Sequence, residues 1–162
     1  MAKARAGDRA AFGKLHNIYA RMVHGVLISR VPPHEADDLT QDVFLTALQR
    51  LNQLKDDNAF GPWLAAIARR RSIDFLRQRK ETSELPEELA GKSRPKAEVM
   101  EALRAIQSLP EAYRETLAMR LVEGMTGPEI AARTGLTPGS VRVNLHRGMK
   151  LLRSNLGVEE ES

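Results

Sequence analysis

The C-terminal third of the chain contains, at residues 126–153, the sequence TGPEIAARTGLTPGSVRVNLHRGMKLLR. Thr126 and Glu129 have the Thr-x-x-Glu spacing of a capping box, and Pro128 falls in the first turn that follows. These signals predict a short helix over residues 128–134. Because a polar, basic helical pattern follows directly, this stretch is typical of two helices joined by a tight turn.

A glycine and a second cap complete the motif. Gly135 follows the short helix where a left-handed C-cap needs it, and Thr137 or Ser140 then caps a last helix. A helix-turn-helix places such a second helix in the major groove of DNA, where Arg can pair with guanine and Asn with adenine. The predicted DNA-facing side chains are Arg142, Asn144, His146, Arg147 and Lys150. The alternative is an ordinary helical hairpin with a basic face in solvent.

The rest of the chain also has helical periodicity, and no segment has the alternation of a strand. Apolar residues recur at three- and four-residue steps and predict helices over 8–29, 35–54, 60–80, 99–109 and 111–122. In the second of these helices, the residues expected on the inner face are Leu39, Val43, Ala47, Leu48 and Leu51. The predicted fold class is all-α.

The helical pattern is interrupted once, by a stretch of Glu, Pro, Ser, Gly and Lys. We therefore predict two small domains, over residues 1–80 and 99–162, joined by a flexible acidic linker over 81–98. An extended linker of this length spans about 50 Å, so the two domains need not touch.

Composition excludes several classes of protein. The 162 residues include no cysteine, which removes disulfides and thiolate metal sites, and the four histidines lack metal-ligand spacing. No Gly-rich phosphate loop follows a strand, and no nucleophile lies beside an evident base, so we expect no enzyme, no metal and no cofactor. No apolar run is long enough for a membrane span, and no signal peptide opens the chain. These features predict a cytoplasmic protein.

The helix predicted over 60–80 combines positive charge with aromatic residues. Residues 1–81 carry 14 Lys and Arg against 9 Asp and Glu. Most of this excess lies in a run made of Arg69, Arg70, Arg71, Arg77, Arg79 and Lys80. Phe60 and Trp63 precede the run, and rings beside cations suit single-stranded DNA because bases stack on them. The alternative is that both rings are ordinary core residues.

The helix predicted over 35–54 has a polar outer face interleaved with one leucine, Leu45. Its polar members are Asp37, Asp38, Gln41, Asp42 and Gln49. A soluble helix often has such a solvated face. The mixture of acids and leucine would also suit a basic helical partner.

Two stretches of this sequence resemble one family. Residues 37–51, DDLTQDVFLTALQRL, followed by FxxWLxxIAR at 60–69, resemble domain two of the bacterial sigma factors of the extracytoplasmic-function (ECF) group. The segment from Leu109-Pro110-Glu111 through Leu145-His146-Arg147 resembles their domain four. The resemblance covers roughly residues 8–154, with the two motif sets in the family's order.

The resemblance implies roles for matching positions. Docking on the β′ clamp helices of core RNA polymerase would involve Asp38, Gln41, Asp42 and Leu45. Recognition of the −10 element and promoter melting would involve Asn58, Phe60, Trp63, Arg69, Arg70, Arg71 and Arg77. The five side chains of the last helix would read the −35 element. Family members usually carry Asn at the position of Arg70, and often Ser and Arg where this chain has Val143 and Asn144. The resemblance therefore does not imply which −10 and −35 sequences this chain prefers.

The implied function is that of an ECF sigma factor, which binds core polymerase and directs it to promoter DNA, with an anti-sigma factor as a further partner and no membrane insertion. One alternative is a sigma-like decoy that titrates an anti-sigma factor without recognising promoters. Another is a free-standing helix-turn-helix regulator, which would leave the first eighty residues unexplained.

Overall fold

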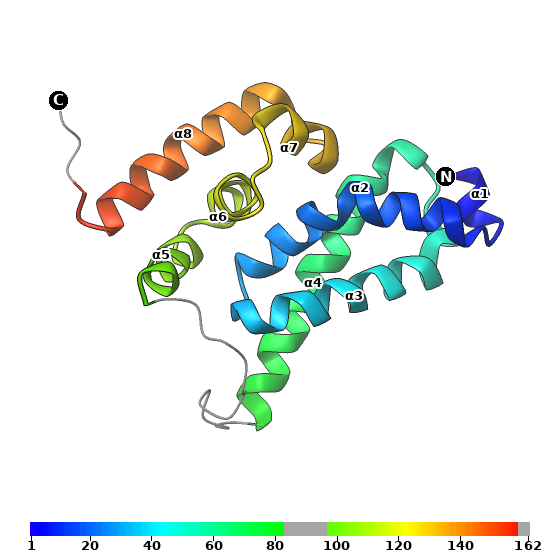
Figure 1. The fold of residues 1–162 in the computed structure, drawn as a ribbon, viewed down its shortest axis with the longest axis horizontal. Coiled ribbons are helices and arrows are strands. Elements are labelled where there is room, and N and C mark those ends of the chain that lie inside the picture. Colours follow the sequence, from blue (N-terminus) through cyan, green and yellow to red (C-terminus); the bar gives the residue numbers. More distant parts are fainter. Residues whose placement is uncertain (83–96, 159–162) are drawn as a thin grey trace.

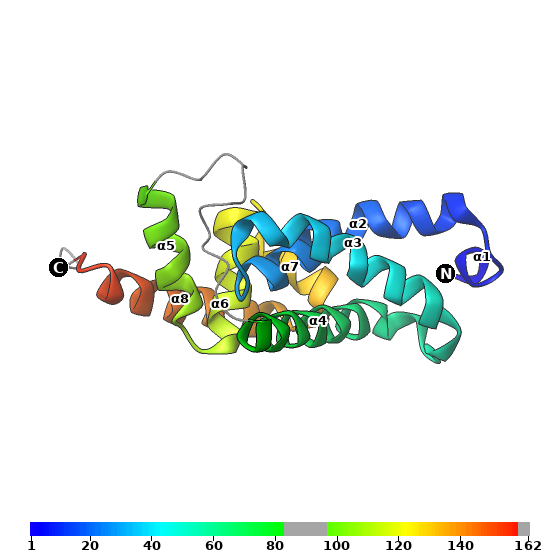
Figure 2. The ribbon, with the colours of Figure 1, turned by 90° about the horizontal axis from the view of Figure 1, so that it is seen from below.

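The computed structural model describes residues 1–82 and 97–158, and within these ranges all regular structure is helical, which confirms the all-α prediction. The elements are α1 (Ala2–Arg5), α2 (Arg9–Ile28), α3 (Pro33–Arg50), η1 (Leu51–Gln53), η2 (Asp57–Ala59), α4 (Phe60–Thr82), α5 (Ala97–Gln107), α6 (Glu111–Leu117), η4 (Ala118–Val122), α7 (Gly127–Thr134) and α8 (Pro138–Asn155). The helix α1 and the C-terminal end of α8 lie at opposite ends of the molecule (Figures 1 and 2).

The predicted helix-turn-helix forms with its predicted caps. Thr126 Oγ1 accepts a hydrogen bond from the Glu129 N–H at 3.2 Å, while the Glu129 side chain accepts one from the Thr126 N–H, so the capping box is complete. Gly135 adopts a φ of 81°, the left-handed conformation that favours glycine. Thr137, rather than Ser140, caps α8 by accepting from the Ser140 N–H at 3.1 Å.

Some boundaries differ from the predicted ones. The helix α3 begins at Pro33 rather than Glu35, because a proline fits the first helical position, where its missing N–H costs nothing. The helix predicted over 111–122 is α-helical only to Leu117 and continues as the π-helical turn η4. Both ends of the predicted linker over 81–98 belong to helices, α4 and α5, and the remainder lies outside the described residues.

The N-terminal unit, residues 1–82, is built around α2, α3 and α4, which pack against one another in Figure 1. Its core contains fully buried Met22, Val26, Val43 and Leu64. The side chains come from the inner stripes of the three helices, as the periodicity predicts.

The C-terminal unit, residues 97–158, packs α8 across α6, with α5 and α7 at the two ends of that contact. Ile106, Leu109, Leu117 and Leu152 form a small core of their own. Gly148 of α8 allows close packing, since a Cβ there would lie 3.0 Å from the Leu117 side chain.

The two units are in contact, although the predicted linker would allow them to be apart. Met119, Met125 and Ile130 of the C-terminal unit are buried in the same hydrophobic cluster as the core of the N-terminal unit. The Gln107 side-chain amide also donates to the backbone carbonyls of Ile28 and Val31, both at 3.1 Å. Apolar side chains of both units are therefore buried together, which stabilises a closed arrangement.

Candidate nucleic-acid interface

The outer face of α3 is polar with exposed leucines. Asp38 and Gln41 are exposed, Asp42 is half-buried, and Leu45 is 58% exposed. Gln41 and Asp42 follow Asp38 by three and four residues and precede Leu45 by four and three, so the four positions lie on one side of the helix.

Leu48 also belongs to this outer face. The prediction that it lies in the core was wrong, because Leu48 is 45% exposed and comes three residues after Leu45 on the same side of α3. Ala47 and Leu51 are buried, as predicted. The apolar part of the face is thus larger than the sequence reading indicated.

The basic helix α4 divides its arginines among three environments. Arg70 and Arg77 are exposed, and Arg70 has only an i,i+4 contact with Asp74 at 3.4 Å. Arg71 instead turns toward α3, where its Nη2 lies 3.1 Å from Asp42 Oδ2. Among the described residues, no hydrogen bond or ion pair joins Arg70 or Arg77, two of the four predicted DNA-reading arginines, to another helix.

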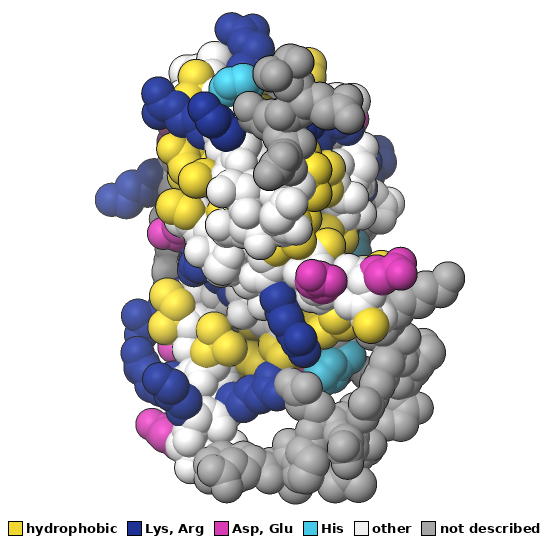
Figure 3. Space-filling model, turned by 90° about the vertical axis from the view of Figure 1, so that its left-hand side faces the viewer, with side chains coloured by type: hydrophobic (Ala, Val, Ile, Leu, Met, Phe, Trp, Pro, Cys, Tyr) yellow, Lys and Arg dark blue, Asp and Glu magenta, His cyan; other side chains and the backbone are white. Residues whose placement is uncertain are grey.

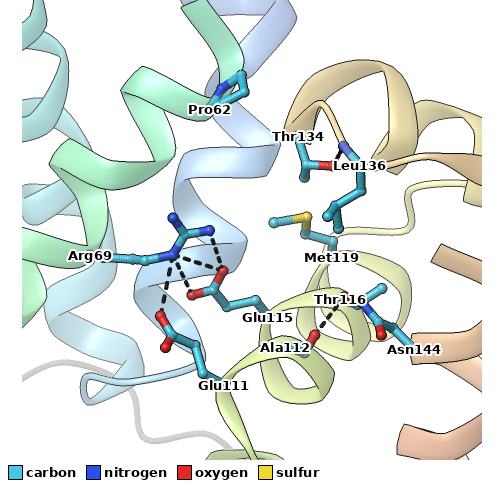
Figure 4. Close-up of a pocket in the computed structure, with 10 residues that line it drawn as sticks. All are labelled: Pro62, Arg69, Glu111, Ala112, Glu115, Thr116, Met119, Thr134, Leu136 and Asn144. Atoms are coloured by element: carbon cyan, nitrogen blue, oxygen red, sulfur yellow. Dashed lines mark hydrogen bonds and ion pairs between the residues drawn. The ribbon is translucent and has the colours of Figure 1, made fainter. Parts of the chain in front are cut away.

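Arg69 turns to the other side of α4 and contacts the C-terminal unit. Its Nε donates to Glu115 Oε2 at 2.9 Å, and its Nη2 donates to Glu115 Oε1 at 2.9 Å (Figure 4). Arg30 Nη2 donates to the same carboxylate at 2.6 Å. The hydrogen bonds that Arg69 donates to the Glu115 carboxylate raise the pKa of Arg69 above its ordinary value.

The acid at the centre of this cluster is deeply buried. The side chains of Glu115 and Arg30 are 7% and 8% exposed, while Arg69 is 37% exposed and reaches the cluster from its rim. Glu111, at the start of α6, also pairs with Arg30 and lies 3.4 Å from Arg69 Nε. A carboxylate that is removed from water in this way needs such cationic donors.

The two aromatic residues of the predicted melting segment have different surroundings. Phe60 is 2% exposed, with Tyr19 at 4.9 Å and Trp63 at 5.9 Å between ring centroids. Trp63 is half-buried, and Asn58 is exposed in η2. The structure thus places Phe60 in the core, as the alternative reading of this ring expected, packs half-buried Trp63 against that core and leaves Asn58 exposed.

Four of the five side chains predicted to face DNA on α8 are exposed: Arg142, His146, Arg147 and Lys150. Asn144 is half-buried and lines a cavity between the units, so the structure does not place it beside the others. At about 100° per residue, Asn144 lies about 200° from Arg142 around the helix, next to the core side. Figure 3 views the molecule from the end at which α8 finishes, where Lys and Arg lie in separate groups among hydrophobic side chains.

The cavity lies at the contact between the units and has a volume of about 270 Å³. Arg69, Glu115, Met119, Leu136 and Asn144 contribute to its walls, and the helices α4, α6 and α8 surround it (Figure 4). Its charged groups already bind one another. Among the described residues, no cluster of three His, Asp or Glu side chains is arranged to hold a metal ion.

The contacts of Arg30, Glu115 and His24 were missed by sequence reasoning. Glu115 is 46 residues from Arg69 and 85 from Arg30, and nothing local marks it as a partner of either. His24 Nδ1 pairs with Glu123 of the C-terminal unit, and its Nε2 lies 3.2 Å from Asp37 Oδ1. Glu123 is the first cause of the raised pKa of His24.

No helix within residues 1–82 and 97–158 is both long and apolar enough to span a membrane.

Two family models match the chain, one for each unit. The model described as "Sigma-70 region 2" matches residues 15–82, and that described as "Sigma-70, region 4" matches residues 100–152. The RNA polymerase sigma factor CarQ of Myxococcus xanthus is 31% identical over 97% of this chain and 95% of its own length. The ECF RNA polymerase sigma factor RpoE of Cereibacter sphaeroides is 32% identical, covering 92% of this chain and 88% of that protein.

A solved structure has the same fold. The structure of CnrH in complex with the cytosolic domain of CnrY matches with a TM-score of 0.64 and 24% identity, covering 98% of this chain and 96% of that chain. The likeness therefore extends over both helical units.

Proposed function

This chain belongs to the sigma-70 family as an RNA polymerase sigma factor of the ECF group. From this premise we propose which of its surfaces bind core polymerase and which bind promoter DNA. The N-terminal domain, residues 1–80, docks on core polymerase and recognises the −10 element. The C-terminal domain, residues 99–162, recognises the −35 element, and the linker over 81–98 connects them. The protein acts in the cytoplasm, without enzymatic chemistry of its own.

Docking on core polymerase is assigned to the outer face of α3. Leu45 and Leu48 are 58% and 45% exposed, which is a large apolar area for a helix whose other side is already packed in the core. Exposed Asp38 and Gln41 border the two leucines. A polar rim that includes the acid Asp38 beside an apolar centre fits a partner helix that is basic at its edges, as proposed for the β′ clamp helices.

Recognition of the −10 element is assigned to the exposed side of α4 and to the segment before it. Arg70 and Arg77 lie about two helical turns apart and offer cations to a DNA backbone. The exposed part of the half-buried Trp63 ring is where an unpaired base stacks, and Asn58 lies just before the start of α4. The buried Phe60 ring packs against the Trp63 ring, with 5.9 Å between their centroids, and so helps to hold Trp63 in place.

Recognition of the −35 element is assigned to α8. The exposed basic side chains of this helix are the main support for the proposed function. Arg142, His146 and Lys150 form an exposed row on the second helix of a completely capped helix-turn-helix, with Arg147 at its side. A major groove admits one helix, and a row of this kind meets base edges and phosphates together. An anti-sigma factor, the proposed inhibitory partner, would act by covering one of these faces.

The test is run-off transcription with purified core polymerase on a library of randomised promoters. We expect the chain to select a promoter class and the variant Arg142→Ala/Lys150→Ala to lose that selection while it still binds core polymerase. The matched control is Asn17→Ala, an exposed polar position on α2. No transcription by the unaltered chain on any library member would contradict promoter recognition and favour the decoy.

A further inference from the structure

One apolar side chain lies within the basic face that α8 is proposed to present to DNA. Val143 is 44% exposed and comes directly after Arg142. Neither hydrophobic cluster of the described residues includes it. A single exposed valine is common on protein surfaces and by itself needs no explanation. The position of Val143 among the basic residues is what distinguishes it.

Val143 lies inside the exposed arc of α8 rather than at its margin. At about 100° per residue, positions at about 0°, 40°, 80° and 140° around the helix belong to Arg142, His146, Lys150 and Arg147. Val143 lies at about 100° on the same scale, between Lys150 and Arg147. His146 and Arg147 also follow it by three and four residues, so both are its neighbours on the helix surface. The arc therefore encloses one apolar side chain among basic ones.

Packing within the C-terminal unit does not account for Val143. The helix α8 lies along the edge of the molecule with α6 on its inner side (Figure 1). Its buried residues are Val141, Gly148 and Leu152, which all lie at least about 140° from Val143 around the helix. A β-branched residue is also a poorer helix former than alanine. Neither burial nor helix formation explains a valine at this position.

We propose that Val143 is a specificity-determining residue, which contacts the C5 methyl group of a thymine in the −35 element. The inference rests on the proposed function, because it needs α8 to lie in the major groove. It deepens that function in two ways: it adds an apolar contact to the basic side chains of α8, and it names the base that this contact selects.

The four bases differ in what they offer to a valine in the major groove. Guanine, adenine and cytosine present hydrogen-bond donors or acceptors there, whereas thymine presents one acceptor and a methyl group. Val143 has no side-chain donor or acceptor, so a polar base edge held against it loses hydrogen bonds to water and gains none. A thymine methyl group instead buries apolar surface against the valine. Thymine is therefore the base that this position favours.

The place of this thymine in the −35 element follows from the geometry of α8. The N-terminal residues of the second helix contact base edges in a helix-turn-helix, and Val143 lies in the second turn of α8, which begins at Pro138. Consecutive Cα atoms are about 3.8 Å apart, close to the base-pair repeat of about 3.4 Å. The thymine should therefore lie within about two base pairs of the position at which Arg142→Ala relaxes the preference.

Removal of single methyl groups from the DNA tests this contact. A promoter that the unaltered chain selects with core polymerase is remade with each −35 thymine replaced in turn by deoxyuridine, which lacks only the C5 methyl group. Binding of the assembled polymerase to these labelled duplexes is then titrated. We expect one replacement, at the position described above, to weaken binding about three- to fivefold, the effect of one methyl group in an apolar contact.

Substitutions of Val143 assign the effect to this side chain. Val143→Ala should stay folded, because alanine is the better helix former, and should bind the thymine and deoxyuridine duplexes equally. The matched control is Val99→Ala, since Val99 is 49% exposed on α5 of the same unit, and this variant should keep the deoxyuridine penalty. Val143→Ser offers a hydroxyl group that can bond to either kind of base edge. In a promoter selection, it should relax the preference for thymine at this position alone.

The outcomes separate this contact from the proposed function. A selected −35 element with no thymine near the Arg142 position, no deoxyuridine penalty for the unaltered chain, or a penalty that persists in Val143→Ala would each overturn the thymine contact. Recognition of the −35 element by the basic side chains of α8 would then still stand. If the unaltered chain selects no promoter, the proposed function fails and the thymine contact fails with it.

Discussion

Arg69 binds Glu115 through two hydrogen bonds of 2.9 Å, although the two residues belong to different units of the molecule. The relationship links the proposed DNA-reading helix α4 to α6 of the C-terminal unit. Because Arg30 shares the same buried carboxylate, the three side chains behave as one cluster. Changes at Glu115 should therefore alter the stability of the contact between the two units.

Glu115→Gln should destabilise the folded chain. The substitution removes the buried one of the two carboxylates that pair with Arg30, whose side chain is 8% exposed, and breaking a buried ion pair on one side costs about 3 to 5 kcal/mol. Because glutamine keeps one acceptor oxygen, we expect the lower end of this range. Urea unfolding followed by circular dichroism measures the change. Glu101→Gln, at an exposed position of α5, is the control, and equal midpoints for both variants would contradict the importance of the cluster.

The packed form should weaken as the pH rises above neutrality. Glu123 first, and then Asp37, raise the pKa of His24 above its ordinary 6.5 in the folded chain. Protonated His24 then stabilises the contact between α2 and the C-terminal unit. This stabilisation is fully present below pH 6.5 and is lost as the pH rises through the raised pKa.

Thermal unfolding across this pH range measures the effect. His24→Gln should flatten the pH dependence of the Tm, because no proton is then bound or released at this position. His146→Gln, at an exposed position of α8, should keep it. Parallel curves for the unaltered chain and His24→Gln would show that another group is responsible.

Docking on core polymerase should depend on the apolar part of α3. Gln41→Ala/Leu45→Ala removes exposed side chains, so we expect the variant to keep its Tm and to lose core polymerase in a pull-down. Asp42 is left unchanged because it pairs with Arg71 at 3.1 Å, and its loss would disturb two surfaces together. Undiminished capture by this variant, with Asn17→Ala as the reference, would remove the assignment.

Local signals in the sequence predicted the elements of this fold well. The capping box at Thr126, the left-handed Gly135 and the helical periodicity each act over a few residues, and each appears in the structure. The wrong prediction for Leu48 has a simple explanation. Counting 100° per residue from Leu45 would have placed Leu48 on the outer face of α3.

The contacts between the units could not be predicted in this way. The pairing of Arg69 with Glu115 joins residues 46 positions apart, and the fit of Gly61 against Arg133 depends on how whole helices pack. A glutamate on an amphipathic helix has no local mark that distinguishes a buried ion pair from a solvated one. Burial of Phe60 follows from packing against Tyr19, which is equally remote in sequence.

Direct reading of bases by α8 should depend on Arg142 and not on Asn144. If Arg142 forks to a guanine, Arg142→Ala should cost about 1 to 3 kcal/mol on the selected −35 duplex and relax the preference at one base. Asn144→Ala is the matched control, because Asn144 lines the cavity between the units. Binding to a panel of base-substituted duplexes measures both. A uniform loss across the panel for Arg142→Ala would identify a phosphate contact instead.

Promoter opening should depend on Trp63, and the neighbouring ring needs a separate variant. Phe60 is 2% exposed, so Phe60→Ala should destabilise the fold by about 3 to 5 kcal/mol and is unsuitable as a probe of melting. Trp63→Ala removes a half-buried ring on which a base stacks for about 1 to 3 kcal/mol. Because stacking holds bases only after the strands separate, Trp63→Ala should impair run-off transcription on duplex promoters and recover on a template with a preformed bubble. Equal loss on both templates, together with a lowered Tm, would mean that Trp63 serves the fold rather than DNA opening.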